Sequence, residues 1–304
     1  MKPLRFTLTL VFAALVVLFG RSAYAGLSIV ATTPDIAAIA RQVGGSAVDV
    51  KTLALPTQDP HFVDAKPSLA LVLNKADLLL VNGLDLEIGW LPTLQSGARN
   101  PKIQVGADGY LDCGTLVPIL EAPAGQVSRA QGDVHPQGNP HYLLDPRNGA
   151  KVGKGIAARL SKLDPANAAG YAQRAADFEK EANALATKLR DKLGAIDAAK
   201  RKVVVYHRSF IYLESWLGLT EVGALEPKPG IPPDPAHVAQ IMVLMKSQGV
   251  KAILEEEYYP MATGKLLAEK TGAAMLVVAG GTGDSQRYLD RIQDVADKLA
   301  GALP

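Results

Sequence analysis

Short apolar runs alternate with helical patterns along most of the chain. In the first half, four runs bounded by turn-forming residues predict strands, at 27–31, 48–53, 77–81 and 102–105. Helices are predicted at 34–44 and 67–74, and the Asp145-Pro146 pair is typical of the start of another, with Asp145 as its N-cap. Strands that alternate with helices form parallel sheets covered by helices, so the predicted fold class is α/β.

One long helical pattern lies in the middle of the chain. Apolar residues recur every three or four positions between Asp164-Pro165 and Gly194. At ~1.5 Å per residue this helix would be about 40 Å long, which is more than one small domain needs. We therefore predict two lobes joined by one rigid helix, with the N-terminal lobe at 26–163, the linking helix at 164–194 and the C-terminal lobe at 195–304.

The C-terminal lobe repeats the alternation of the first half. Its strands are predicted at 202–206, 221–225, 250–254 and 273–278. Its helices are predicted at 210–217, 234–249, 261–270 and 285–303. Ligands of open α/β sheets lie outside the carboxyl ends of the strands, so each loop after a strand is a candidate wall of a binding site.

Residues 1–25 have the features of a secretory signal peptide. Lys2 and Arg5 precede an apolar run at 8–19, and Ala23-Tyr24-Ala25 fits a small-x-small cleavage site. The run is shorter than the roughly 20 residues that span a bilayer. No cysteine follows the run to carry a lipid. We therefore expect a mature protein that is free in the periplasm, without a lipid anchor, and monomeric.

The charge balance and the cysteine count exclude several classes of protein. The formal charge is +2, but without Lys2, Arg5 and Arg21 the mature chain has 29 basic and 30 acidic residues. Such a balance offers no electrostatic basis for binding nucleic acid or an anionic membrane. Cys113 is the only cysteine, so an internal disulfide is excluded.

Four residues stand where a ligand site is expected. His61, His207 and Asp284 follow predicted strands, and His141 lies at a comparable turn between Pro140 and an apolar run. The N-terminal lobe supplies two of them and the C-terminal lobe the other two, so a cleft between the lobes could gather all four. Three imidazoles and one carboxylate suit a tetrahedral Zn²⁺.

Each of these residues also has a simpler interpretation. His61 could only pack a turn, and Asp284 could be the N-cap of the last helix. Glu255, Glu256 and Glu257 rival Asp284 as acidic ligands, although a solvated turn is the favoured interpretation of this row.

Other charged and imidazole side chains lie near the candidate ligands. His135 lies in a polar loop at 120–139 that is rich in Gly, Pro, Gln and Ser, and we interpret it as a loop residue, with loose metal capture as the alternative. Arg208 and Arg287 could pair with charge near the site. His237 falls in the first turn of a capped helix and is not a candidate ligand.

The chain resembles the zinc and manganese solute-binding proteins of bacterial ABC importers over essentially its whole mature length. The resemblance is carried by Asp59-Pro60-His61 with Lys66-Pro67-Ser68, Asn82-Gly83 with Leu86-Glu87, Asn139-Pro140-His141 with Leu144-Asp145-Pro146, Tyr206-His207, and Gly283-Asp284 before Tyr288. It implies two α/β lobes joined by one long helix, with the metal between them. It also implies delivery to a membrane permease. A periplasmic metallochaperone is a further candidate partner.

The resemblance identifies His61, His141, His207 and Asp284 as the expected metal ligands. Members that select manganese commonly have a carboxylate in place of the third histidine, so His207 favours zinc over Mn²⁺. Many zinc members carry a histidine-rich stretch before the position of Asn139, whereas this chain has only His135 there.

Two other classes of function remain open from the residues alone. One is a zinc-dependent hydrolase with three histidine ligands, in which Glu256 or Asp284 acts as the base for a metal-bound water. The other is a metal-independent binder of a small organic solute. A closed shell of four ligands leaves no position for a reactive water, which favours carriage of the ion over catalysis.

Overall fold

The computed structural model describes residues 26–123, 125 and 135–303. The predicted signal peptide at 1–25 and most of the polar loop, at 124 and 126–134, lie outside the described residues. Within the described ranges, no helix combines the length and the apolar character needed to cross a membrane.

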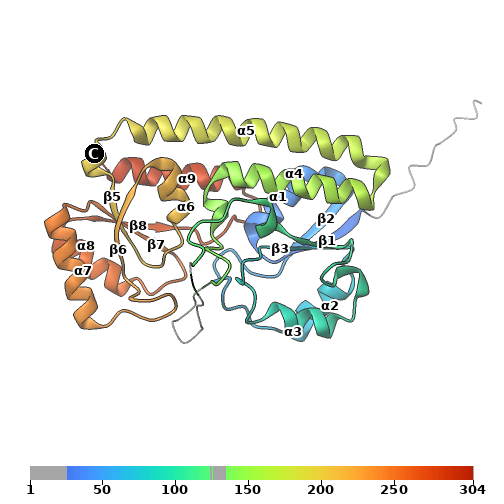
Figure 1. The fold of residues 1–304 in the computed structure, drawn as a ribbon, viewed down its shortest axis with the longest axis horizontal. Coiled ribbons are helices and arrows are strands. Elements are labelled where there is room, and N and C mark those ends of the chain that lie inside the picture. Colours follow the sequence, from blue (N-terminus) through green and yellow to red (C-terminus); the bar gives the residue numbers. More distant parts are fainter. Residues whose placement is uncertain (1–25, 124, 126–134, 304) are drawn as a thin grey trace, which may run out of the picture.

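Two four-stranded sheets form the centres of two lobes (Figure 1). The first has the order β2-β1-β3-β4, made of β1 (Leu27–Ala31), β2 (Val48–Thr52), β3 (Leu78–Val81) and β4 (Tyr110–Asp112). The second has the order β6-β5-β7-β8, made of β5 (Lys202–Val205), β6 (Thr220–Ala224), β7 (Ala252–Glu256) and β8 (Ala274–Val278). All neighbouring strands are parallel, so the carboxyl ends of each sheet meet at one edge.

Helices cover both faces of each sheet. One face of each sheet packs against a core that is common to both lobes. The helices on this side are α1 (Pro34–Gly44), α4 (Pro146–Leu163), α5 (Ala168–Gly194), α6 (Ile211–Leu217) and α9 (Tyr288–Ala302). On the opposite face, α2 (Pro67–Asn74) and α3 (Leu91–Ala98) cover the first sheet, and α7 (Pro235–Gln248) and α8 (Ala262–Thr271) cover the second. Central strands such as β3 and β7 are therefore buried on both faces, whereas the edge strands β2 and β6 are partly exposed.

A single hydrophobic core joins the two lobes. Alternate strand residues point to opposite faces, so Ile29 lies in the shared core while Val30 packs against α2 and α3. The shared core continues along α5, where Phe178 and Leu193 are fully buried, and into the second sheet at Val203. Figure 1 shows α5 running above both sheets. The predicted α/β fold with two lobes and one rigid linking helix is confirmed.

Several predicted boundaries are wrong. The strand predicted at 102–105 does not form, because Pro101 opens a short 3-10 helix whose N-cap, Asn100, accepts a hydrogen bond from the backbone of Lys102. The fourth strand lies instead at Tyr110–Asp112, and α3 is a helix that the sequence pattern did not indicate. The division into lobes at 164 and 194 stays a prediction, since the shared core crosses both positions.

Candidate metal site

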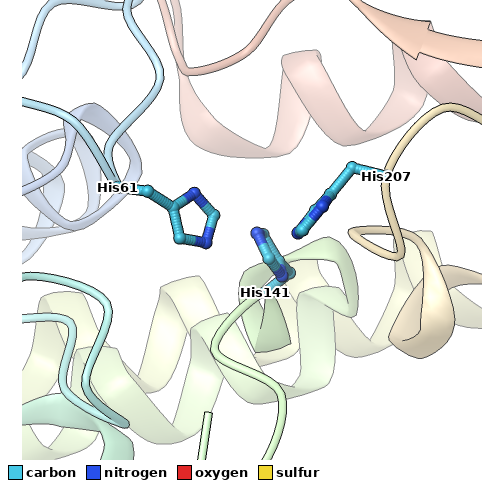
Figure 2. Close-up of side chains that lie close together, drawn as sticks. All are labelled: His61, His141 and His207. Carbon is cyan, nitrogen blue, oxygen red and sulfur yellow. The ribbon is translucent and has the colours of Figure 1, made fainter. Parts of the chain in front are cut away.

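Three imidazoles meet where the carboxyl ends of the two sheets face each other. His61 follows β2, His141 precedes the turn at Tyr142–Leu144, and His207 follows β5. Their rings form a triangle with each pair of centroids 5.3 Å apart, and one nitrogen from each lies within 4.8 Å of the others. Figure 2 shows the three rings converging from separate segments. A tetrahedral Zn²⁺ would need nitrogens about 3.3 Å apart, so a small contraction would close the site.

Two of the histidines are held by the same local device. In Asp59-Pro60-His61, Oδ1 of Asp59 accepts hydrogen bonds from the backbone N–H of His61 (2.9 Å) and from its ring Nδ1 (2.7 Å). In Asn139-Pro140-His141, Oδ1 of Asn139 accepts from the same two groups of His141, at 3.0 and 2.9 Å. Such Asx turns tie each ring to its own backbone and assign the proton to Nδ1.

The third histidine is oriented from a neighbouring strand. His207 Nδ1 lies 2.7 Å from Oε2 of Glu226, which follows β6. Both side chains are buried. In all three rings an oxygen atom therefore lies at Nδ1, which leaves Nε2 as the nitrogen that can bind an ion between the rings. This is the arrangement that metal-binding histidines need. Nε2 of His141 is buried without a hydrogen-bond partner among the described residues.

The segment that carries His141 is fixed by the C-terminal lobe. The Tyr212 hydroxyl of α6 donates to the carbonyl of Asn139 at 3.0 Å, and the Trp216 indole donates to the carbonyl of Leu144 at 2.9 Å. From α9, the Tyr288 hydroxyl donates to the carbonyl of Leu143 at 2.6 Å. His141 is therefore positioned by contacts that cross between the lobes.

The electrostatics of the site set the protonation of the imidazoles. Burial lowers the pKa of His141 well below its ordinary value, and the neighbouring His207 and His61 lower it further. Burial acts in the same direction on His207, but the hydrogen bond and charge of Glu226, with Glu256 and Asp59 nearby, raise its pKa overall. A neutral His141 can bind a metal directly, whereas a protonated His207 has to release its proton when the metal binds.

Replacing Glu226 with Gln is expected to change the strength and the pH dependence of metal binding. A proton on His207 competes with the metal, so affinity falls as the pH is lowered through the raised pKa of this ring. In Glu226→Gln, this fall should move to lower pH. Affinity at pH 8 should drop by about 10- to 100-fold, because the ring loses its charged orienting partner. Zinc titrations buffered by a chelator between pH 5.5 and 8 measure both effects.

Glu179→Gln provides the matched control for this experiment. Glu179 lies on α5 and pairs with Lys154 at 2.8 Å, and it makes no hydrogen bond to an imidazole. Its variant should keep the pH profile of the unmodified protein. An unchanged profile in Glu226→Gln would show that Glu226 does not set the proton affinity of His207.

The structure places Asp284 away from the three histidines. It lies in an exposed turn between β8 and α9, and it is not part of the group of ligand atoms within 4.8 Å. It is not an N-cap either: α9 begins at Tyr288, later than predicted, with Arg287 at the capping position. Asp145, by contrast, caps α4 as predicted, since its Oδ1 accepts from the backbone of Arg147 at 2.9 Å.

The acidic row at the end of β7 is not the solvated turn that the sequence favoured. Glu255 and Glu256 are buried and only Glu257 is exposed, because β7 extends through Glu256 in the middle of its sheet. Burial raises the pKa of both Glu255 and Glu256 to about 7. Glu256 lies near enough to His207 to raise the pKa of that ring.

Other predicted neighbours have defined positions. Nε2 of His135 lies 3.2 Å from Nε2 of His61, so this residue borders the site and does not lie apart from it. Arg208 pairs with Glu121 at 2.7 Å and with Glu221 at 3.3 Å, and Arg287 pairs with Glu181. Neither arginine is paired with a candidate ligand. His237, as predicted, is a helix residue, and its Nε2 donates to the carbonyl of Ala224 at 2.9 Å.

Two α/β lobes with a convergent set of imidazoles in the seam between them define a metal-binding solute receptor. The chain belongs to the family described as "Zinc-uptake complex component A periplasmic" (ZnuA), whose sequence model matches residues 29–302. The protein is therefore a metal-binding, substrate-binding component of an ABC transporter, which works with a membrane permease and its ATPase. Members of this family are not enzymes, so the hydrolase alternative is wrong.

Relatives of the chain are named for different metals. It is 25% identical over 286 residues to the manganese ABC transporter substrate-binding lipoprotein PsaA of Streptococcus pneumoniae, covering 91% of this chain and 89% of the relative. It is 27% identical over 282 residues to the iron-binding protein YfeA of Yersinia pestis, covering 90% and 85%.

Solved structures share the fold. The crystal structure of ZnuA superposes with a TM-score of 0.78 at 23% identity, covering 92% of this chain and all of the other (100%). The manganese-bound S38A mutant of a periplasmic metal-binding protein from Candidatus Liberibacter asiaticus gives 0.74 at 23%, covering 91% and 100%. Since the relatives differ in the metal they are named for, the metal of this chain has to be argued from its own residues.

Proposed function

We propose that the cargo of this importer component is zinc and that His61, His141 and His207 are three of its four protein ligands. The observation that supports this most is the shared geometry of the rings, with each Nδ1 held by an oxygen and the opposite nitrogens converging. Imidazole suits zinc, whereas manganese prefers harder oxygen ligands. Mn²⁺ is therefore expected to bind more weakly.

Asp284 is the fourth ligand in this proposal. Its carboxylate would complete a tetrahedral shell of three nitrogens and one oxygen and leave no position for a reactive water. Because Asp284 lies in an exposed turn, it has to move toward the imidazoles when the ion binds. The lobes themselves share a core, so the movement belongs to the turn and not to a hinge between lobes.

The proposal includes the cellular setting predicted from the sequence. The protein would be exported by the signal peptide at 1–25, remain monomeric in the periplasm without a lipid anchor, and receive zinc directly or from a metallochaperone. The streptococcal relatives differ in this respect, since they are named as lipoproteins.

A metal competition experiment tests the proposed cargo. Metal-free protein titrated in chelator buffers should prefer Zn²⁺ to Mn²⁺ by at least about two orders of magnitude, because three of its four ligands are imidazoles. Cu²⁺ serves as the reference ion that such ligands bind well. Equal affinities for zinc and manganese would contradict the assignment. Elemental analysis of protein purified without chelators should find zinc, and manganese or iron in its place would contradict the assignment.

A further inference from the structure

The loop between β8 and α9 is attached to the opposite lobe. Asp35 lies in the first turn of α1, and its Oδ1 accepts hydrogen bonds from the Thr282 backbone N–H at 2.9 Å and from the Thr282 hydroxyl. Thr282 is buried. These bonds join residues that are 247 positions apart in the sequence and that belong to different lobes.

The buried guanidinium of Arg291 also binds this loop. Nη1 of Arg291, on α9, donates to Oδ2 of Asp35 at 3.0 Å. Its Nε and Nη2 donate to the carbonyl of Ala279 at 3.2 and 2.9 Å, and Nη2 also donates to the carbonyl of Gly280 at 3.1 Å. Arg291 is only 4% exposed, so these charge-assisted hydrogen bonds are made away from solvent.

The position of Arg291 is unfavourable for a helix taken alone. It lies in the first turn of α9, where the helix dipole disfavours a cation, whereas Asp35 lies at the start of α1, where the dipole favours an anion. The unfavourable interaction of Arg291 with the dipole of α9 is therefore offset by its tertiary contacts with Asp35 and the two carbonyls.

Close packing leaves this loop little freedom. A Cβ on Gly281 would lie 3.0 Å from Pro34, at the start of α1, and a Cβ on Gly280 would lie 2.2 Å from the Tyr258 ring. The loop also borders a small cavity of about 60 Å³ at the seam, which is lined by His141, Glu256 and Arg291 among others. The loop and the imidazoles thus share one region of the seam.

We propose that Asp35, Thr282 and Arg291 form an interlobe clasp that fixes residues 279–282 and thereby sets the reach of Asp284 toward the metal. The three are positioning residues, and their role rests on the proposed function, in which Asp284 is a ligand. The clasp ends at Thr282, so only Gly283 separates the fixed part from Asp284. At about 3.3–3.6 Å per residue, Asp284 can move by only a few ångströms, through rotation at Gly283.

The clasp should act mainly on how long the ion stays bound. When the loop is fixed, the carboxylate of Asp284 can occupy only a small volume, so it loses less conformational entropy when it binds the ion. A carboxylate that dissociates also rebinds quickly. With the clasp broken, the carboxylate is lost more easily and the dissociation rate of zinc increases. Association, which begins at the imidazoles, should change little.

Thr282→Val tests the clasp with a small change. Valine keeps the shape and the backbone N–H but removes the hydroxyl that donates to Asp35. We expect zinc to dissociate about tenfold faster, measured by stopped-flow mixing with a chelator, and Kd to rise by the same factor, as the loss of one hydrogen bond to a charged group predicts. Arg291→Lys, which cannot hold both carbonyls and Asp35, should have at least this effect.

The same change in an Asp284→Ala background separates a positioning role from a structural one. Asp284→Ala alone should weaken binding, and adding Thr282→Val to it should cause no further loss, because the clasp has no carboxylate left to position. Thr115→Val is the matched control: its hydroxyl donates to the carbonyl of Asp112 at 2.6 Å, in the N-terminal lobe and outside the clasp, and the variant should bind like the unmodified protein.

The possible outcomes distinguish the clasp from the proposed function. If Asp284→Ala binds weakly but Thr282→Val binds like the unmodified protein, the clasp is overturned and the ligand assignment stands. If Thr282→Val weakens binding equally with and without Asp284, the hydroxyl acts on the fold and the clasp is again overturned. If Asp284→Ala binds zinc as tightly as the unmodified protein, the fourth ligand is wrong and the clasp loses its target.

Discussion

Zinc binding should fall by more than about 100-fold when His141 is replaced by Ala. Changing a residue that only orients a metal ligand typically costs 10- to 100-fold, and loss of a ligand itself should cost more. Among the three imidazoles, His141 has the most features that suit it to bind a metal. Burial lowers its pKa, Asn139 holds its Nδ1, and its Nε2 is buried without a described partner. Chelator competition at pH 7.5 gives the affinity.

His237→Ala is the matched control for the His141 variant. It removes one imidazole from the same protein, but from α7, where the ring donates to the carbonyl of Ala224. Its zinc affinity should stay within about threefold of the unmodified protein, as expected for a residue outside the ligand group. A His141→Ala variant that binds as tightly as the control would show that the imidazole triangle is not the metal site.

Phe178→Ala should destabilise the folded protein by about 3–5 kcal/mol. Phe178 is fully buried in α5, its ring lies 6.1 Å from the ring of Tyr288 on α9, and the backbone of Gly153 on α4 approaches it closely. Truncation leaves a cavity between α4, α5 and α9, and these helices cannot each move inward to fill it. Urea denaturation measures the free energy of unfolding, and Asn183→Ala, at an exposed position of α5, should change it by less than about 0.5 kcal/mol.

The fluorescence of the two tryptophans can show whether the loss of stability in Phe178→Ala affects both lobes. Trp90 packs in the N-terminal lobe against α3 and Trp216 lies on α6 in the C-terminal lobe. In variants that keep only one of them, Phe178→Ala should shift both fluorescence transitions by the same amount, because the shared core joins the lobes. Two separate midpoints would mean that the lobes unfold independently.

The sequence predicted best those elements whose signal is local. Buried central strands such as β3 and β5 are formed by nearly continuous apolar runs, and both were predicted close to their observed bounds. β4 was missed because an edge strand of three residues, only one of which is buried, has no periodic pattern. That the three histidines lie close together could be predicted because each is placed at a strand end or a turn that faces the seam.

The groups that orient the histidines differ in how far the sequence could reveal them. Asp59 and Asn139 share one local pattern, an Asx residue followed by proline and histidine, and that repetition could have predicted both hydrogen bonds. Glu226 could not be found in this way, because it lies 19 residues from His207 and meets it only through the pairing of β5 with β6. Asp284 follows Thr282, whose hydrogen bonds to Asp35 join positions 247 residues apart, and no local pattern reveals such a contact.

The core that runs through α5 is shared by the two lobes, so we expect the lobes to unfold together. A chain break within this helix would expose an apolar face on each fragment. An ion held at the seam would then stabilise the entire polypeptide, by about 2.7 kcal/mol when free metal is at 100 times Kd. The empty carrier would be the form that proteases degrade first, so the amount of this protein in a cell would follow the supply of its metal.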